Sequence, residues 1–471
     1  MTENRELSSE YQWCLDEFAA AELGDARLNA RCGELAVQLA KQPNGPSNRS
    51  GEDWADTKAA YRFFDNDQVT PDRIQAPHYE RTVERMAQCK RVLAVQDTSF
   101  LNYTPHPKTQ GLGEIGTKKK KQRGCGLHST LAVTPGGLPL GLLTQAFFTR
   151  PIGEPSHTPA ECRKLPIEEK ESYRWLEAFE QIIALKPAGV QVVTVCDAEA
   201  DIYEMFSLAQ EKKAPLLVRA SANRVLLEDE FHKLWPKLEH QSRAGSYSIQ
   251  IVGNNKRKAR TTTVSVRFGE VTFRPPWRPT GVTLPAVTLR AILVKEENPP
   301  ADVDEPIEWL LLTNVPVPTF AAASEIIGWY CCRWQIELFH KVLKSGCRVE
   351  DCRLRTAERL FNFIALMSVI AWRLHWMTYI NRCRAELPCT VALTTVEWEA
   401  LYMRIHKTSQ LPDFVPTIYQ AVRWIAKLGG FLGRKSDGEP GLTTIWRGWL
   451  RLRDIADTWY LVKEHANATC G

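Results

Sequence analysis

Two aspartates each follow directly on a short, β-branched apolar stretch of the chain. Asp97 ends the segment RVLAVQD, and Asp197 ends the segment VQVVTVCD. Apolar runs of this length predict buried strands, and in parallel sheets functional groups gather where the strands end. Two acids at neighbouring strand ends could share a divalent cation. Each aspartate could instead be only a turn residue or the N-cap of a following helix.

The second aspartate has two acidic neighbours, Glu199 and Asp201, which compete for the same role. We favour Asp197 because it leaves the predicted strand directly. Glu199 and Asp201 can face solvent on the helix that follows.

A third acid lies in the amphipathic segment YCCRWQIELFHKVLK, residues 330–344. Built as one helix at 100° per residue, this segment brings five polar side chains into an arc of about 80°: Tyr330, Arg333, Glu337, Lys341 and Lys344. The opposite side is apolar and consists of Cys332, Ile336, Phe339, Val342 and Leu343. One acid among three cations is poorly suited to self-pairing and better suited to an external anion. The alternative is an ordinary surface helix with i,i+4 ion pairs.

Three such carboxylates point to phosphoryl transfer. Cleavage of a phosphodiester requires an activated water or 3′ hydroxyl and a stabilised leaving oxygen, and two Mg²⁺ ions about 3.5–4 Å apart provide both. Mg²⁺ prefers oxygen ligands, and three acids with no histidine partner favour Mg²⁺ or Mn²⁺ over zinc. We therefore expect Asp97, Asp197 and Glu337 to hold two Mg²⁺ ions, with Mn²⁺ as a substitute.

Composition and charge fit a soluble globular chain of about three domains with a polyanionic partner. The 471 residues are 44% hydrophobic and 24% charged, with a net charge of +5. The positive charge is clustered in KKKKQR (118–123), in NNKRKAR (254–260) and at Arg348, Arg353 and Arg355. Clusters in a nearly neutral chain suit a polyanion bound along tracks, although any single lysine run could be a solvated loop.

The cysteines and apolar segments predict a cytoplasmic protein. The thirteen cysteines include no C-x-x-C pair, and such a scattered set is typical of reduced thiols. The start of the chain, MTENRELSSEYQW, has no apolar region of the signal-peptide type. Residues 361–376 are the most lipid-like, but Arg373 and His375 interrupt them before spanning length, which predicts a buried helix.

Hydrophobic periodicity divides the chain into three kinds of segment. Residues 10–85 predict short helices with one basic side. Strands at 91–99, 126–134, 137–148, 190–197 and 214–221, with a helix at 171–186, predict an α/β sheet of partly parallel character. Strands between 224 and 313 predict a separate antiparallel insertion, and from 321 onward the chain reads as helical except for a loop at 429–441.

The segment 330–344 matches the signature Y-x2-R-x3-E-x6-K in full, through Tyr330, Arg333, Glu337 and Lys344. The chain thereby resembles the DDE transposases of the IS-four type of bacterial insertion sequences, especially the Tn-five branch. LAVQDTS, VTVCDAEAD, EWLLLT and GGFLGRKSDGEPGLTTIWRGW resemble further segments of that family. The likeness begins at LGDARLNAR and is least specific beyond residue 380. KKKKQR and the Cys331–Cys332 pair are departures that leave the scheme intact.

For the fold, this resemblance implies an α/β protein with a ribonuclease-H-like catalytic core and an antiparallel β insertion. The implied domains are a helical DNA-end-binding domain (1–75), a catalytic domain (76–380, with the insertion at about 222–313) and a helical dimerisation domain (381–471). The protein would be bacterial, cytoplasmic and nucleoid-associated, with no membrane partner.

For the function, the resemblance implies a cut-and-paste transposase. A homodimer would bind the inverted-repeat ends, cleave them through a hairpin and join the 3′ ends to target DNA. Tyr330, Arg333 and Lys344 would hold DNA near the scissile phosphate, and Trp309 would stack on a flipped base, although a strand tryptophan is more often a core residue. Further contacts to double-stranded DNA would come from Lys341, Arg348, Arg219, Arg27, Lys41 and Arg62.

Two other classes of protein are alternatives. A plain metal-dependent nuclease would not need the insertion, the DNA-binding flanks or a dimerising tail. A catalytically silent DNA-binding regulator or domesticated transposase would not need all three acids.

Overall fold

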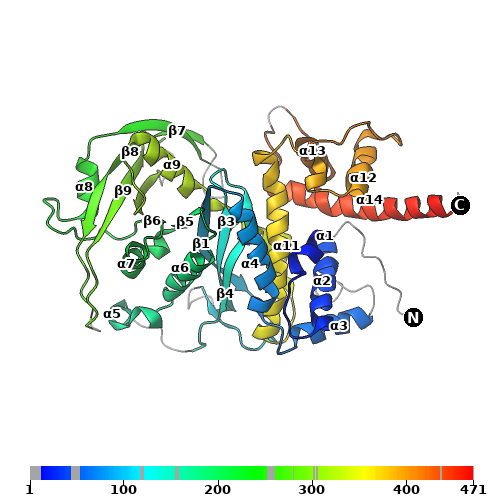
Figure 1. The fold of residues 1–471 in the computed structure, drawn as a ribbon, viewed down its shortest axis with the longest axis horizontal. Coiled ribbons are helices and arrows are strands. Elements are labelled where there is room, and N and C mark those ends of the chain that lie inside the picture. Colours follow the sequence, from blue (N-terminus) through cyan, green and yellow to red (C-terminus); the bar gives the residue numbers. More distant parts are fainter. Residues whose placement is uncertain are drawn as a thin grey trace.

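Figure 1 presents the computed structural model, in which a long mixed sheet is flanked by helices from both ends of the chain. The structure describes residues 12–43, 54–116, 121–153, 159–251, 260–278, 281–300, 303, 306–434 and 437–469. Residues 118–120 of the basic cluster at 118–123, and residues 254–259 of the one at 254–260, lie outside the described residues. Their expected contact with a polyanion therefore stays a prediction.

In the part of the chain that the structure describes, ten strands form one sheet in the order β2-β3-β1-β5-β6-β10-β9-β8-β7, with β4 paired to β3. The strands are β1 (Arg91–Asn102), β2 (Gly113–Ile115), β3 (Gln122–Val133), β4 (Pro139–Phe148), β5 (Gln191–Cys196), β6 (Leu216–Arg219), β7 (Gly245–Ile251), β8 (Arg260–Phe273), β9 (Val287–Glu296) and β10 (Glu308–Thr313). Only the β1–β5 and β5–β6 pairs in this sheet are parallel. The predicted α/β sheet of partly parallel character is confirmed.

The antiparallel strands after residue 224 form as expected, but they are not a separate unit. β10 pairs with β6, with Leu312 opposite Val218, so the later strands extend the same sheet. An unpaired β6 would leave a row of backbone donors and acceptors open at the sheet edge. Periodicity reveals that a segment is a strand but not which strand it pairs with, and for this reason the expectation of separateness was wrong.

Alternation along the strands assigns the two faces of the sheet. Leu93 and Val95 of β1 pack in the core that includes α9, α10 and α11, whereas Val92 and Ala94 pack in a core with α6. Both faces are covered, which explains why the parallel strands read as continuous apolar runs. The helices are α1 (Gln12–Phe18), α2 (Ala26–Lys41), α3 (Trp54–Phe64), α4 (Pro71–Ala87), α5 (Pro159–Lys164), α6 (Tyr173–Leu185), α7 (Tyr203–Glu211), α8 (Leu234–His240), α9 (Phe320–Cys331), α10 (Trp334–Lys341), α11 (Ala357–Cys383), α12 (Thr395–His406), α13 (Ile418–Leu428) and α14 (Leu442–Thr469).

Helix α11 is the central helix of the protein, as the sequence predicted for residues 361–376. Among the described residues it is the one helix long and apolar enough to cross a membrane, but 83% of its apolar window is buried inside the protein. It runs between the sheet with α4 on one side and the terminal helices on the other (Figure 1). Its apolar length is therefore accounted for by packing within the fold.

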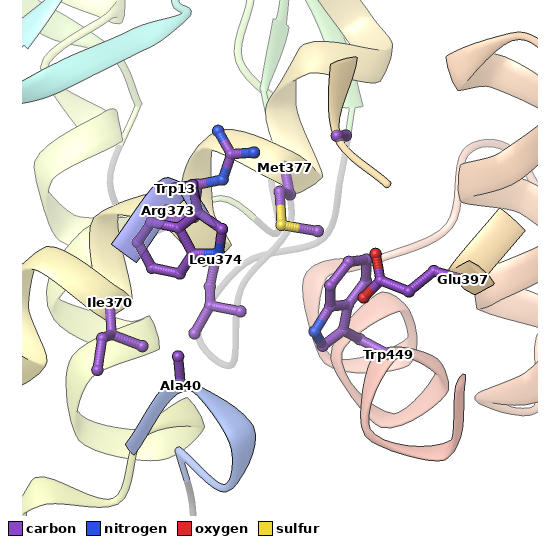
Figure 2. A pocket seen from close by; sticks show the side chains of 9 residues that line it. Trp13, Ala40, Ile370, Arg373, Leu374, Met377, Glu397 and Trp449 are labelled. Atoms are coloured by element: carbon purple, nitrogen blue, oxygen red, sulfur yellow. The ribbon is translucent and has the colours of Figure 1, made fainter. Parts of the chain in front are cut away.

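The terminal helices meet around α11. Figure 2 shows a small cavity there, with Trp13 and Arg373 on one side and Glu397 and Trp449 on the other. The Arg373 guanidinium lies 4.2 Å from the ring centre of Trp376, and burial lowers its pKa to about 10. None of the residues lining this cavity belongs to β1, β5 or α10, so it is not part of the site formed by the three predicted acids.

Candidate active site

Asp97 lies within β1 and not at the end of a strand. β1 continues to Asn102 because its pairing with β3 continues, with Asp97 directly opposite Ser129. On the other edge, the parallel pairing with β5 ends at Val95 opposite Val195. The expectation that the strand stops at Asp97 was wrong. The acid does lie where its parallel neighbour ends, so one edge of β1 is open beside it.

Asp197 follows β5 directly, as predicted, and lies level with Asp97. In the β1–β5 register Val95 is opposite Val195, so residues two further along in each chain segment reach the same height. The Asp197 carboxylate also accepts the Glu199 N–H at 2.8 Å, as N-cap of a single 3₁₀ turn, Ala198–Ala200. The alternative prediction for Asp197 was an N-cap, and Asp197 is both an N-cap and a neighbour of Asp97. Burial and the charge of Asp97 raise the pKa of Asp197.

The same alternation that assigns the sheet faces directs Asp97 toward α10. Leu93 and Val95 face the core with α9, α10 and α11, and side chains two residues apart on a strand share a face. Asp97 is the next member of that series. The alternation of side chains along β1 therefore places Asp97 on the face of the sheet that α10, with Glu337, packs against.

The segment 330–344 is not one helix. α9 ends at Cys331, α10 begins at Trp334, and residues Val342–Gly346 form a π turn. Between the two helices the backbone keeps helical dihedral angles, but the Arg333 N–H bonds to the Tyr330 carbonyl, three residues back. This tightened turn breaks the uniform 100° step from which the row was predicted. Ile336, Phe339, Val342 and Leu343 are buried as expected, and Cys332 is half-buried.

Glu337 lies in the first turn of α10 and is bound by the preceding cation. The Arg333 guanidinium donates to Glu337 Oε1 at 2.5 Å. The row was expected to be poorly suited to self-pairing, and that expectation was wrong, because this i,i+4 pair forms. Burial and the charges of Asp97 and Asp197 raise the pKa of Glu337, while Arg333 opposes the shift. The three acids therefore act on one another electrostatically.

The three carboxylates have the oxygen ligands and the negative charge that a divalent cation requires. In this conformation their side chains do not point at one common position. Across the described residues, no three acidic, histidine or cysteine side chains are close enough to hold one metal ion. In this conformation the Glu337 carboxylate is engaged by Arg333. Three mutually repelling carboxylate groups would favour a cation among them, and their oxygens are the ligands that Mg²⁺ and Mn²⁺ prefer. The three acids fit such an ion once the Glu337 carboxylate leaves Arg333 and binds the ion instead.

His340 is a residue that the sequence argument missed. Its ring is buried, and its Nδ1 lies 3.6 Å from Asp97 Oδ2. The expectation of three acids with no histidine partner was therefore wrong. The sequence held one signal: His340 is three residues after Glu337, and side chains at that spacing are neighbours on a helix surface.

The two acids that compete with Asp197 are placed differently. The Asp201 side chain is fully buried and accepts from Arg224 and from the N–H groups of Ser221 and Ala222. It ties the turn after β5 to the loop after β6, so the expectation that it faces solvent was wrong. Glu199 is exposed, and partial burial together with the charges of Asp197 and Asp97 raises its pKa.

Cations surround the acids. Arg219 ends β6, and its charge acts on Asp197 and on Tyr330. Lys344 is half-buried in the π turn, and burial lowers its pKa while the charges of Glu350 and Asp97 oppose the shift. Lys341 is exposed at the end of α10. This arrangement suits a phosphate beside the three acids.

The other predicted DNA contacts lie further along the chain or on its N-terminal helices. Arg348 is exposed in a left-handed backbone conformation and pairs with Asp351. Arg27 and Arg62 are exposed on α2 and α3, and Lys41 is half-buried in the last turn of α2. These helices do not carry the acids, so the structure places these residues in a second region.

Trp309 is half-buried on β10. Its ring centre lies 5.4 Å from that of Tyr330, with the planes at 63°. Tyr330 is buried beneath it and is 5% exposed. The indole therefore combines packing against Tyr330 with a part that is accessible to solvent.

Comparison with known families matches three segments, of which the last two overlap by a few residues. The family described as "Transposase DNA-binding" matches residues 10–69, "Transposase DDE domain" matches residues 176–374, and "Transposase Tn5 dimerisation domain" matches residues 369–463. Asp197 and Glu337 lie inside the second segment, and Asp97 lies before it. The three matches identify an enzyme that binds DNA, cuts and joins it, forms homodimers and uses divalent metal ions. The chain belongs to the Tn5-like DDE transposases.

Proposed function

We propose that this transposase moves DNA by cut-and-paste. It binds the inverted-repeat ends of its element, cleaves them by metal-dependent phosphoryl transfer through a hairpin, and joins the 3′ ends to target DNA. The observation that carries the proposal is the convergence of Asp97, Asp197 and Glu337 on one side of the sheet, with Arg333 and Lys344 beside them.

In this proposal Asp97, Asp197 and Glu337 hold two Mg²⁺ ions, for which Mn²⁺ can substitute. When bound, such ions activate the attacking water or 3′ hydroxyl and stabilise the leaving oxygen. The surrounding cations, Arg219 and Lys344, hold the phosphate so that the scissile bond faces the acids. Orientation of this kind lowers the barrier because the reacting groups no longer have to find one another.

Arg333 has two partners in turn. In the free protein its guanidinium pairs with Glu337. A DNA phosphate offers an alternative: its two non-bridging oxygens share one negative charge, and the planar guanidinium group can bind both of them in bidentate fashion. Transfer of Arg333 to the phosphate would release Glu337 for the cation, so DNA binding and completion of the metal site would be coupled.

The ends of the chain would supply recognition and pairing. Arg27, Lys41 and Arg62 lie on N-terminal helices suited to DNA-end binding, within a proposed domain of residues 1–75. The proposed catalytic domain covers 76–380 and the proposed dimerisation domain 381–471. The far end of α14 extends beyond the rest of the protein (Figure 1), and Val462 on it is 52% exposed. We place homodimer contact there and the working protein at the nucleoid.

The proposal is tested by a cleavage assay with the full chain and DNA from the flanks of its gene. With Mg²⁺ or Mn²⁺ we expect a nick at the element end, then a hairpin, then joining to a target plasmid. With the metal removed by chelation we expect end binding alone. Unspecific cutting without joining would instead support a metal-dependent nuclease. Binding without any cutting in Mg²⁺ or Mn²⁺ would support a silent regulator.

Replacement of Trp309 by alanine should slow the hairpin step and spare the first nick. A hairpin requires a sharp reversal of the backbone, and an indole can hold the base that leaves the stack for about 1–3 kcal/mol. That free energy corresponds to roughly five- to 150-fold in rate. Nicking and hairpin rates measured on the same end DNA report the two steps separately.

A control for this prediction is Trp309→Phe, which keeps an aromatic face and most of the contact with Tyr330. It should retain much of the hairpin rate. If Trp309 serves only packing, Trp309→Ala will slow both steps equally and lower the melting temperature. That result would remove the stacking role.

A further inference from the structure

Buried polar side chains form a continuous chain from helix α4 to Asp97. Tyr79 Oη donates to Gln75 Oε1 at 2.7 Å, and Gln75 Nε2 donates to Gln145 Oε1 at 2.6 Å. Gln145 Nε2 then lies 3.1 Å from Ser129 Oγ. The series joins α4 to β4 and β3, whose Ser129 stands directly opposite Asp97.

His340 completes this chain from the other side. Its Nε2 lies 3.3 Å from Ser129 Oγ, and its Nδ1 lies 3.6 Å from Asp97 Oδ2. Gln75, Ser129, Gln145 and His340 are all buried. Buried polar groups are costly unless they are paired, so a connected series of them in a core calls for a reason.

One backbone carbonyl sets the direction of the hydrogen bonds from Gln75 to Ser129. The Ala365 carbonyl on α11 can only accept, and Gln75 Nε2 donates to it at 3.1 Å. The Gln75 amide is thus oriented with its nitrogen toward Gln145 Oε1. Gln145 must then present its own nitrogen to Ser129, whose oxygen accepts.

The direction continues to the histidine. The Ser129 oxygen accepts from Gln145 and its hydroxyl proton can still donate to His340 Nε2, while the Asp97 carboxylate that faces Nδ1 can only accept. A neutral ring that accepts at Nε2 carries its proton on Nδ1. The Nδ1–H therefore points at Asp97 Oδ2, at a distance from which a small movement of the carboxylate makes a hydrogen bond.

We propose that His340 is a positioning residue that holds the Asp97 carboxylate in the orientation needed for a divalent cation. The inference rests on the proposed metal site, and it adds a residue outside the three acids. Through Ser129, Gln145 and Gln75, the ring is fixed to α4 and α11, so packing of those helices determines how Asp97 is presented. Such outer contacts typically change metal affinity or activity by about 10–100-fold when removed.

Two substitutions at one position separate the two ends of the ring. In His340→Asn, the amide nitrogen lies as many bonds from Cβ as Nδ1 does, so a donor toward Asp97 is kept. In His340→Gln, the amide oxygen lies as many bonds from Cβ as Nε2 does and can accept from the Ser129 hydroxyl, so the contact with Ser129 is kept and the donor toward Asp97 is lost. Binding of Mn²⁺ to the full chain is measured from the signal of free Mn²⁺ in electron paramagnetic resonance. The Mn²⁺ concentration for half-maximal end cleavage is measured alongside.

We expect Mn²⁺ binding to weaken by about 10–100-fold in His340→Gln and to stay near that of the unsubstituted chain in His340→Asn. Ser129→Ala, which keeps the ring but frees it, should fall between the two and provides the test if His340→Gln does not fold. His375→Gln is the matched control. That ring is equally buried, on α11, and its nitrogens have no hydrogen-bond partner among the described residues; its replacement should leave Mn²⁺ binding unchanged.

Failure of the inference and failure of the proposed site give different results. If Asp97→Asn abolishes Mn²⁺ binding while His340→Gln and Ser129→Ala bind as the unsubstituted chain does, the metal site stands and the positioning role is wrong. If Asp97→Asn itself binds Mn²⁺ normally, the proposed site is wrong. Equal weakening in His340→Gln and His340→Asn would also overturn the inference, because it would show a general packing effect.

Discussion

Replacement of Asp97, Asp197 or Glu337 by alanine is expected to reduce end cleavage by about 10³-fold or more while end binding is retained. Metal ions contribute several kcal/mol to stabilisation of the transition state in such reactions, and each 1.36 kcal/mol is a factor of ten in rate. Binding survives because the acids do not read bases and their loss removes negative charge from a site for DNA. Single-turnover cleavage and gel-shift titration on the same end DNA measure the two effects.

The matched controls use the structure of the turn after β5. Asp197→Asn keeps an oxygen that can accept the Glu199 N–H and removes only the charge, so it separates metal binding from capping. Glu199→Gln changes an exposed acid next to it and should retain cleavage. Normal cleavage in Asp197→Asn with loss in Glu199→Gln would exchange the roles of the two residues. Normal cleavage in any alanine variant of the three acids would remove that residue from the site.

Affinity for end DNA is expected to fall by about 10³–10⁵ between 50 and 200 mM salt. This is the loss for a protein that makes about 6–10 phosphate contacts, since each contact releases counterions from DNA. Arg333, Lys341 and Lys344 beside the acids would supply part of these contacts, and basic residues on α2 and α3 another part. The slope of log affinity against log salt concentration, from fluorescence anisotropy, gives the number of contacts.

Two lysines make this prediction residue-specific. Lys341→Ala should reduce the salt slope by about one, because the Lys341 side chain is exposed beside the acids and has no ion pair within the described residues. Lys186→Ala should leave the slope unchanged. Lys186 lies before the start of β5, whereas Asp197 follows its end, so the two residues lie at opposite ends of that strand. Affinity that does not change with salt would contradict an interface dominated by phosphate contacts.

Features that depend on local pattern were predictable from the sequence. Strand period and helix period are properties of neighbouring residues, and they identified the strands that contain or precede Asp97 and Asp197, the helix α2 and the buried helix α11. The spacing of Tyr330, Arg333, Glu337 and Lys344 is also local, and it led to the family that comparison confirmed. The three acids could be named because each has a distinctive sequence context.

Features that depend on which segments meet were decided only by the tertiary structure. β1 continues past Asp97 because β3 pairs with it there, and β10 joins the main sheet because β6 offers an open edge. The 330–344 segment divides into two helices and a π turn, since packing, not intrinsic period, sets its hydrogen bonds. His340 reaches Asp97 across more than two hundred residues of chain, through a fold that sequence spacing does not describe.

Sequence thus determined the chemical groups and their local elements. Long-range pairing and packing determined their distances, because those contacts are made by residues that no local pattern relates.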